Sequence, residues 1–187
     1  MHAQALRSIY QLKVSLKGLR PPVWRRFLIS SSDSLQAVHL VLQIVMGWSD
    51  AHLHEFVQGR ERYGVPDEDF PDGVQDEIDY RLGQVLKQEK DRLNYVYDFG
   101  DGWEHEVVLE KVLPFTPDAV LPLCLEGGGA CPPEDIGGIP GYEMFLAVLS
   151  DPAHPEHEEL MEWSGGNFDS LHFDLAQTND LLREYCD

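Results

Sequence analysis

The chain has 187 residues, 43% of them hydrophobic, and a net charge of −19 at pH 7. This length suits one globular domain with its own core, so we expect a single domain over 1–187, sheet-rich over 1–113 and with a connector and helical part over 114–187. No apolar stretch approaches the roughly 20 residues of a membrane-spanning helix, the first residues lack a signal-peptide pattern, and the three cysteines are an odd, low count, which together favour a cytoplasmic protein without membrane association.

The charge is unevenly distributed along the chain. Residues 1–32 carry six basic and no acidic side chains, whereas the remaining 155 residues carry eight basic and 33 acidic ones, a net charge of −25. The basic segment either pairs with the acidic remainder within the fold or presents a small face to a protein or polyanion partner. Nucleic acid is a possible partner, although the net charge does not support it. The candidate partner-binding residues are Lys13, Lys17, Arg20, Arg25 and Arg26.

The first elements follow from simple periodicities. Residues 10–16 alternate between apolar and polar, which predicts a strand, and 23–29 resume after a turn as its hairpin partner. Residues 34–46 are predicted to form a helix, because their apolar side chains recur at helical spacing. Asp33 and Gln36 resemble a capping box at its start, and Gly47 suits its end.

The middle of the chain predicts short strands and an acidic loop. Residues 53–57 and 60–63 read as strands around a turn at Gln58-Gly59. Residues 67–80 contain seven acidic side chains without apolar periodicity, which indicates a solvated loop. A further short strand is expected over 79–86.

The remainder predicts a second hairpin and then helices. Strands are expected over 94–97 and 103–113, followed by a proline-rich connector over 115–122. Residues 127–141 are rich in Gly and Pro and are expected to be irregular. Helices are then predicted over 140–149, 155–163 and 174–185. Strands followed by helices indicate an α+β fold with a mostly antiparallel sheet, one packed helix and a helical C-terminal third.

Two histidines of the 53–57 region are candidate metal ligands. On a strand, His52, His54 and Phe56 share one face, so the two imidazoles are placed to bind one metal ion. The alternative is a histidine pair hydrogen-bonded at the end of a sheet. The sequence names no third ligand at this spacing.

The run from Asp98 to His105 predicts a tight hairpin. Gly100 and Gly102 permit positive φ, and Asp98 and Asp101 are placed to accept hydrogen bonds from nearby amides. His105 shares a strand face with apolar neighbours and is expected to be half-buried. A buried histidine beside two carboxylates is either a metal ligand, a general base or a structural pair.

A third cluster surrounds the second cysteine. Cys131 is either a reactive thiol or a buried structural one, and Glu134 and Asp135 follow it closely. His154 and His157 are three residues apart at a helix start, which is compatible with a metal site but is also explained as ordinary helix-start sequence.

Several motifs together resemble one known family. These motifs are Pro22-Val-Trp-Arg-Arg26, Gly47-Trp48, His52-Leu-His54-Glu-Phe56, Tyr97-Asp-Phe-Gly-Asp101, Trp103-Glu-His105, Gly128-Gly-Ala-Cys-Pro-Pro-Glu-Asp135, Gly141-Tyr142 and Asp151-Pro152. The chain resembles, from about Tyr10 to Tyr185, the family named for the third open reading frame of a root-inducing (Ri) plasmid. Some members carry the label of insertion-element passenger proteins, so the resemblance implies a link with mobile DNA and names no catalytic residue.

Two functions remain open at this point. The first is a non-enzymatic binding or accessory module that uses the basic hairpin. The alternative is a metal-dependent enzyme, such as a hydrolase, that binds a divalent cation such as zinc. Its candidate ligands are His52, His54 and His105, and its candidate catalytic residues are Asp98, Asp101, Cys131, Glu134 and Asp135. The two readings differ in one structural respect, which is whether these side chains converge.

Overall fold

The computed structural model describes residues 7–67 and 73–186. The strands are β1 (Ser8–Leu16), β2 (Trp24–Ser30), β3 (His54–Gln58), β4 (Glu61–Gly64), β5 (Gln75–Asp76), β6 (Arg92–Tyr97), β7 (Trp103–Pro114) and β8 (Leu123–Gly128). The helices are α1 (Leu35–Met46), α2 (Leu82–Val85), α3 (Gly138–Leu149), α4 (His157–Trp163) and α5 (Leu175–Tyr185).

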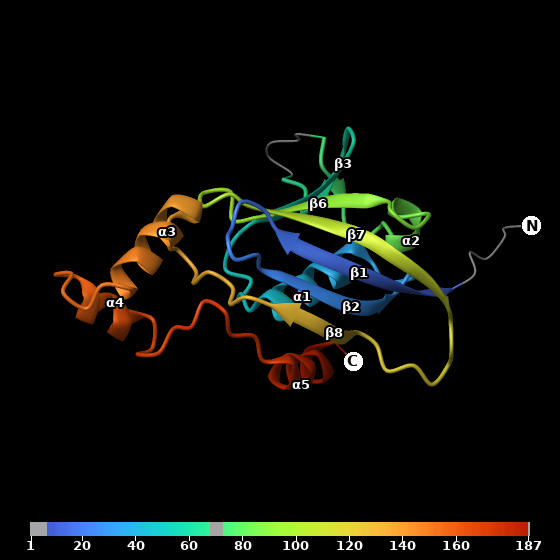
Figure 1. Ribbon diagram of the computed structural model, residues 1–187. Coiled ribbons are helices and arrows are strands. Elements are labelled where there is room, and N and C mark those ends of the chain that lie inside the picture. The colour runs from blue at the N-terminus through green and yellow to red at the C-terminus, as the bar shows by residue number, and fades with distance from the viewer. Residues whose placement is uncertain (1–6, 68–72, 187) are drawn as a thin grey trace, which may run out of the picture.

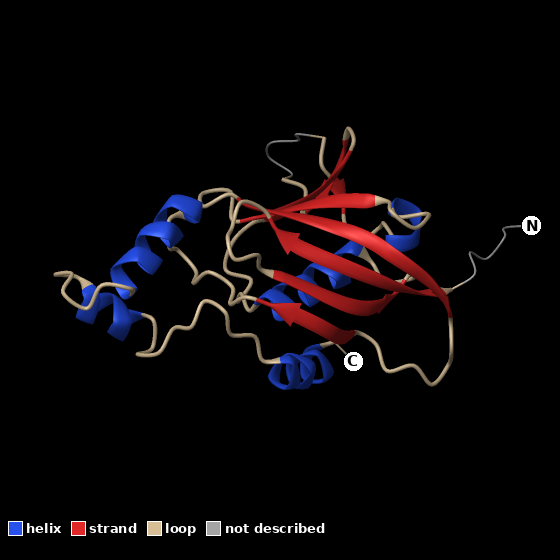
Figure 2. Cartoon of the chain, viewed as in Figure 1, coloured by secondary structure: helices blue, strands red, loops and turns tan. Residues whose placement is uncertain are grey.

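The strands form one twisted sheet in the order β5-β4-β3-β6-β7-β1-β2-β8. All pairings are antiparallel except that of β4 with the short β5. Helix α1 lies across one face of this sheet, α5 lies beside the edge strand β8, and α3 and α4 project from one end (Figures 1 and 2). The prediction of an α+β fold with a mostly antiparallel sheet is confirmed.

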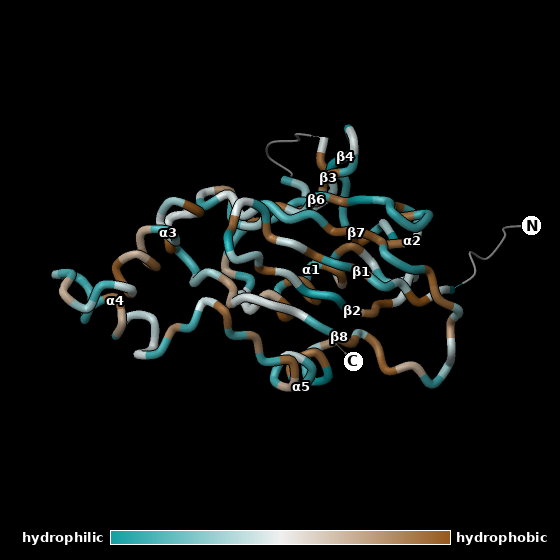
Figure 3. The backbone as a smooth tube through the Cα atoms, viewed as in Figure 1, coloured by the Kyte–Doolittle hydropathy of each residue, from teal (hydrophilic) through white to brown (hydrophobic). Residues whose placement is uncertain are grey.

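The core lies between the sheet and α1. Strand β1 alternates between buried and partly exposed residues, as its sequence predicts, with Leu12 and Val14 fully buried. Figure 3 shows hydrophilic and hydrophobic residues following one another along these strands. The two predicted hairpins are present, because β1 pairs with β2 and β6 with β7. The partly exposed positions of these strands include Gln11 and Arg26, which both hydrogen-bond to Glu110.

Helix α1 buries the predicted apolar face, but its cap is one residue later than expected. The Ser34 hydroxyl, and not the Asp33 carboxylate, accepts a hydrogen bond from the Ala37 amide (3.1 Å). The capping-box prediction at Asp33 is therefore wrong. The C-terminal end is as predicted, with Gly47 in the left-handed region at φ 106°.

The region after β4 differs from the sequence prediction. Residues 79–86 form no strand. Instead, Leu82–Val85 within this range form the single-turn helix α2. Its apolar side chains, Leu82 and Val85, are buried in the core. A short apolar run is compatible with either a strand or a helical turn, and here it forms a helical turn. Glu68, Asp69 and Asp72 of the predicted acidic loop lie outside the described residues.

Strand β8 was not predicted, because its sequence is glycine-rich. Gly127 and Gly128 were expected to be irregular, yet they pair with Arg25 and Trp24 of β2. A Cβ atom on Gly127 would lie 2.7 Å from both Arg25 Cδ and a ring carbon of Phe173. Glycine is therefore needed here because large side chains cover the strand.

The C-terminal third is only partly helical, since long irregular segments separate α3, α4 and α5. Helix α5 begins as predicted, with the Asp174 carboxylate accepting from the Gln177 amide (2.9 Å). None of the helices in the described part of the chain has the length and apolar character needed to span a bilayer.

Candidate functional site

The segment that joins α1 to β3 runs beside the turn that joins β6 to β7. Strand β3 pairs with β6 so that His54 lies opposite Tyr97. The Asp98 amide then donates to the Leu53 carbonyl (2.9 Å), which brings His52 next to the Asp98 turn. The strand register and this hydrogen bond therefore place the two segments side by side.

Three carboxylates surround one nitrogen of His52. Its Nε2 atom lies 3.1 Å from Asp135 Oδ1, 3.6 Å from Asp98 Oδ2 and 3.7 Å from Glu134 Oε2. Asp98 is nearly buried, whereas the Asp135 side chain is 75% exposed, so the cluster opens to solvent on one side. Four of the candidate residues thus converge, from three separate parts of the sequence.

The two carboxylate oxygens of Asp98 make different contacts. Oδ1 accepts hydrogen bonds from the amides of Gly100 (2.9 Å) and Asp101 (3.3 Å). Oδ2 is the oxygen that faces His52. Asp98 also has a positive φ of 56°, an uncommon conformation for a non-glycine residue, and Asp135 has the same value. The hydrogen bonds to Oδ1 therefore fix the Asp98 carboxylate with its other oxygen toward the imidazole.

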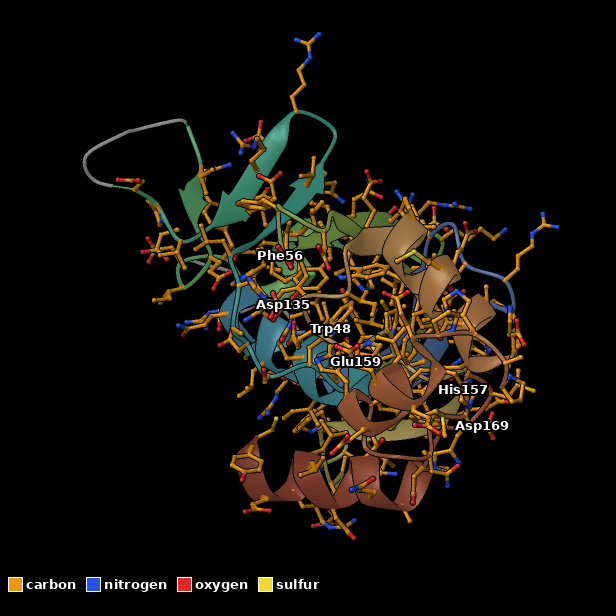
Figure 4. All side chains as sticks on the ribbon, turned by 90° about the vertical axis from the view of Figure 1, so that its left-hand side faces the viewer. Trp48, Phe56, Asp135, His157, Glu159 and Asp169 are labelled. Carbon is orange, nitrogen blue, oxygen red and sulfur yellow. The ribbon has the colours of Figure 1, made fainter. Side chains whose placement is uncertain are left out.

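The loop that carries Glu134 is anchored on the end of α1. The Trp48 indole N–H donates to the Pro132 carbonyl (3.1 Å), and the Ser49 amide donates to Glu134 Oε1 (3.0 Å). The Tyr97 hydroxyl donates to the same oxygen (3.0 Å). Burial, together with the Glu134 carboxylate, raises the pKa of Tyr97. Figure 4 views this end of the molecule and labels Trp48 and Asp135.

Asp101 supports the cluster without joining it. Its Oδ2 accepts from the Gly137 amide (3.1 Å), which ties the Asp98 turn to the loop of Glu134 and Asp135. Gly138 follows with φ 67°, and a Cβ atom there would lie 2.5 Å from the Asp101 carbonyl oxygen. Asp101 is therefore placed as a positioning residue.

The ligand-type atoms of the cluster lie close together, at spacings that are mostly wider than those around a bound metal ion. His52 Nε2 is shielded from solvent and, among the described residues, has no hydrogen-bond partner, because its contact with Asp135 lacks hydrogen-bond geometry. Metal–ligand bonds of about 2.1 Å place neighbouring ligand atoms about 3.0–3.4 Å apart. One atom each from His52, Asp98 and Asp135 lies within 4.8 Å of the other two, so these three side chains are the candidate ligands of the cluster.

His54 belongs to a second cluster that the sequence reasoning missed. Its ring stacks on that of His39, and its Nε2 lies 2.8 Å from Glu77 Oε2. Glu77 was expected in a solvated loop but is 2% exposed, so that prediction is wrong for this residue. His52 and His54 therefore face different carboxylates, and the two do not converge on one ion.

His105 lies in the core, apart from both clusters. Its Nδ1 is 3.1 Å from the Tyr95 carbonyl oxygen, and its ring packs edge-on against Trp48. It is fully buried rather than half-buried, and burial lowers its pKa to about 4. It is a neutral structural histidine here, and the expected grouping with His52 and His54 is not present.

Cys131 packs against the hydrophobic core. Burial raises the pKa of its thiol well above the ordinary value, with nearby Arg25 opposing the shift only in part. A thiol that stays protonated is a poor nucleophile. The geometry therefore favours the structural role for Cys131.

The basic hairpin is largely neutralised within the fold. Arg26 binds Glu110 and Glu126, and Lys17 lies 3.4 Å from Glu104. Lys13 lies over the Trp24 ring, 5.0 Å from its centroid, and Arg20 is exposed.

Arg25, a candidate partner-binding residue, does not lie at the surface. It is 2% exposed and donates to the carbonyls of Val45 (2.7 Å), Trp24 (2.8 Å) and Gly128 (2.8 Å). The Phe173 ring covers its guanidinium at 4.0 Å. Its backbone contacts join β2, α1 and β8, so its role is structural.

Comparison with known proteins places the chain in a family. The model of the plasmid pRiA4b ORF-3-like proteins matches residues 8–177. The chain belongs to this family. Its membership agrees with the resemblance seen in the sequence motifs, and the family name gives a plasmid link.

Two relatives extend the comparison. The uncharacterized protein y4hQ of Sinorhizobium fredii is 41% identical over 180 residues, covering 94% of this chain and 91% of the relative. A crystal structure of a protein of unknown function, MM3350 from Methanosarcina mazei Go1, is 35% identical with a TM-score of 0.82, covering 91% of this chain and 97% of that one. These relatives support the family and the fold, and their names assign no activity.

Proposed function

We propose that this protein is a divalent-metal-dependent enzyme of the hydrolase class, with its ion held at His52. The observation that carries the proposal is the position of His52 Nε2, which has no hydrogen-bond partner in the described chain and faces three carboxylates at 3.1–3.7 Å. Three carboxylates around one imidazole nitrogen repel each other unless a positive charge lies between them.

The residues divide into ligands and a base. His52, Asp98 and Asp135 would hold the ion, a mixed nitrogen and oxygen set that suits zinc and leaves a position open where Asp135 meets solvent. When bound, such an ion supplies Lewis acidity and makes a water molecule more acidic. Glu134 is fixed through Oε1 by Ser49 and Tyr97, so its Oε2 is directed toward the cluster and is placed to accept a proton from that water.

Of the four cluster residues, His52 alone lines the neighbouring pocket. A pocket of about 760 Å³ opens next to His52 and is also lined by His39, His54 and Phe99. Pockets of this size accept small molecules. The alternative of a binding module that uses the basic hairpin is less well supported, because Arg25 is buried and Arg26 and Lys17 are paired with glutamates.

Metal affinity tests the ligand set directly. Untagged protein is stripped with chelator and titrated with zinc against a chromophoric chelator. We expect one site per chain, with affinity reduced at least about tenfold in Asp98→Asn and Asp135→Asn. Asp118→Asn is the matched control, because Asp118 is an exposed carboxylate in the connector before β8. Wild-type affinity in both ligand variants would refute the assignment.

Catalysis is tested separately from binding. Zinc-loaded protein is assayed with p-nitrophenyl acetate and bis(p-nitrophenyl) phosphate as general ester substrates. If Glu134 is the base, Glu134→Gln keeps zinc affinity within about threefold but loses at least about a hundredfold in rate. Equal rates in the wild type, Glu134→Gln and the chelated protein would show that the site is not hydrolytic toward these esters.

A further inference from the structure

A second pocket adjoins the His52 cluster, and we name it the α3–α4 cleft after the two helices that supply most of its lining. It has a volume of about 390 Å³. Of the four cluster residues, Asp135 alone lines this cleft, whereas His52 lines the larger pocket. Figure 4 looks onto this end of the molecule and labels Asp135 and Glu159, which both line the cleft. Two of the three proposed ligands therefore each border a different pocket.

The lining of the α3–α4 cleft is mostly apolar. Phe145 is 1% exposed, and Ile136 and Leu160 are partly buried side chains that pack against the core. Met144 and Trp163 are 63% and 50% exposed, although both line the cleft. Exposed apolar side chains are common singly, but two large ones in one cleft leave apolar surface in water that a ligand would cover.

The aromatic part of the lining suits a ring-sized group. The rings of Phe145 and Trp163 lie edge to face, with centroids 5.9 Å apart and planes inclined by 79°. Aromatic rings favour this arrangement, and the exposed surface of Trp163 can make a similar contact with a further ring. The thioether of Met144 is flexible and also contacts rings favourably. A cleft of this volume accepts a group of about the size of a phenyl ring.

The charged side chains of the cleft are two carboxylates at its rim. The Asp135 side chain is 75% exposed and Glu159 is exposed, so both are hydrated. No Lys or Arg is among the described residues that line the cleft. An anionic ligand would therefore find no countercharge, whereas an uncharged group gains from the apolar walls. Because Asp135 is a proposed metal ligand, a group in the cleft would lie beside the proposed ion.

We propose that the α3–α4 cleft binds an uncharged apolar group of the substrate, of about the size of a phenyl ring. This inference rests on the proposed function, since Asp135 joins the cleft to the metal site. The bond to be hydrolysed would lie at the His52 cluster, and the apolar group would lie against Met144 and Trp163. The substrate class is therefore an uncharged ester or amide that carries a ring-sized apolar group.

Binding is first measured without metal, by ligand NMR titration of the full chain in EDTA. N-benzylacetamide carries the ring on a neutral amide, N-methylacetamide lacks the ring, and phenylacetate carries the ring with a negative charge. We expect N-benzylacetamide to bind at least about tenfold more tightly than either. No binding of N-benzylacetamide at about 10 mM, or tighter binding of benzyltrimethylammonium, would overturn the proposal.

Variants then locate the ring. Met144→Ala and Trp163→Ala should each weaken the binding of N-benzylacetamide at least about fivefold, whereas Phe99→Ala should not. Phe99 is the matched control, because it is 54% exposed but lines the larger pocket. Met144 is a surface residue, so its variant keeps the fold and remains informative if Trp163→Ala loosens α4. Loss in Phe99→Ala alone would place the ring in the larger pocket and would contradict the proposal.

A pair of hydroxamates tests the link between the cleft and the metal site. Phenylacetohydroxamate joins the ring to a zinc-chelating group, and acetohydroxamate has the same chelating group without the ring. In zinc-loaded protein, we expect the ring to tighten binding at least about tenfold, and Met144→Ala to remove most of this gain. Equal binding of the two hydroxamates, with N-benzylacetamide still bound, would show that the cleft does not serve the metal site.

Failure of the metal site itself gives a different result. Zinc would then leave the binding of both hydroxamates unchanged, in the wild type as in Asp98→Asn, while N-benzylacetamide would still bind and still depend on Met144. That pattern would refute the proposed function but would keep the cleft as a binding site for the apolar group.

Discussion

The imidazole rings of His39 and His54 lie face to face, with centroids 3.4 Å apart and planes inclined by 4°. His39 is fixed in this position by a closed set of hydrogen bonds. Gln43 donates to the Tyr95 hydroxyl (2.9 Å), Tyr95 lies 2.8 Å from His39 Nδ1, and the Asp50 amide donates back to Gln43 (2.8 Å). Tyr95 therefore donates to Nδ1, which leaves the proton of neutral His39 on Nε2 and directed at Asp50.

Stability should fall on acidification because of His105. Its pKa is lowered to about 4 in the folded protein and is about 6.5 when unfolded, so the unfolded chain takes up a proton first as the pH falls. The contribution of His105 is complete above pH 6.5 and is lost progressively down to pH 4, amounting to about 3 kcal/mol. Burial of the imidazole in the folded core is the main cause of this lowered pKa.

Urea denaturation at several pH values measures this loss. His105→Leu should flatten the fall in unfolding free energy between pH 6.5 and 4, whereas exposed His172→Leu should leave it unchanged. The pKa of Glu110 is also lowered, mainly by its hydrogen bond to Arg26. Its contribution to stability is therefore lost only at a pH below the ordinary pKa of a glutamate, which is more acidic than the His105 range. An unchanged slope in His105→Leu would contradict the assigned shift.

Arg25 should be essential for stability, whereas its neighbour Arg26 should not. Arg25→Lys removes hydrogen bonds to carbonyls of three segments and the stacking on Phe173, and a buried ammonium cannot replace them. We expect a loss of about 2–4 kcal/mol in the free energy of unfolding. Arg26→Lys, on the partly exposed outer face, should cost about 1 kcal/mol or less. Equal losses in the two variants would show that Arg25 is not the structural residue described above.

The basic hairpin should not bind duplex DNA. Arg25 is buried, and the carboxylates of Glu104, Glu110 and Glu126 compete for Lys17 and Arg26. The whole chain also carries a charge of −19, which repels a polyanion over about 10 Å at moderate salt. Fluorescence anisotropy with labelled duplex and single-stranded DNA at low salt should show no binding.

One result would reverse this expectation. Binding that weakens steeply with added salt, and that is lost in Lys13→Gln and Arg20→Gln, would assign a phosphate-contacting role to the hairpin. Those two residues are chosen because no carboxylate salt bridge to either is present in the described chain. Lys111→Gln is a suitable control on the neighbouring strand β7.

The amino-acid sequence by itself determined the local elements. Alternation over 10–16 specifies a strand with one buried face, and the spacing of Leu35, Val38 and Leu42 specifies a helix with one apolar face. These patterns depend only on residues two to four positions apart, so neighbouring residues are enough to read them. The Asp98 turn is equally local, because the carboxylate bonds to amides two and three residues ahead of it.

The tertiary structure alone decided where the chemistry lies. Nothing local distinguishes Glu77, which is buried against His54, from the other acidic residues of its segment, and nothing local shows that Arg25 is covered by Phe173. His52 meets Asp98 through the register of β3 with β6, and it meets Asp135 because Trp48 and Ser49 hold a distant loop on the end of α1. The sequence could name these side chains as candidates, but their convergence depends on strand pairing and loop docking between residues that are far apart in the chain.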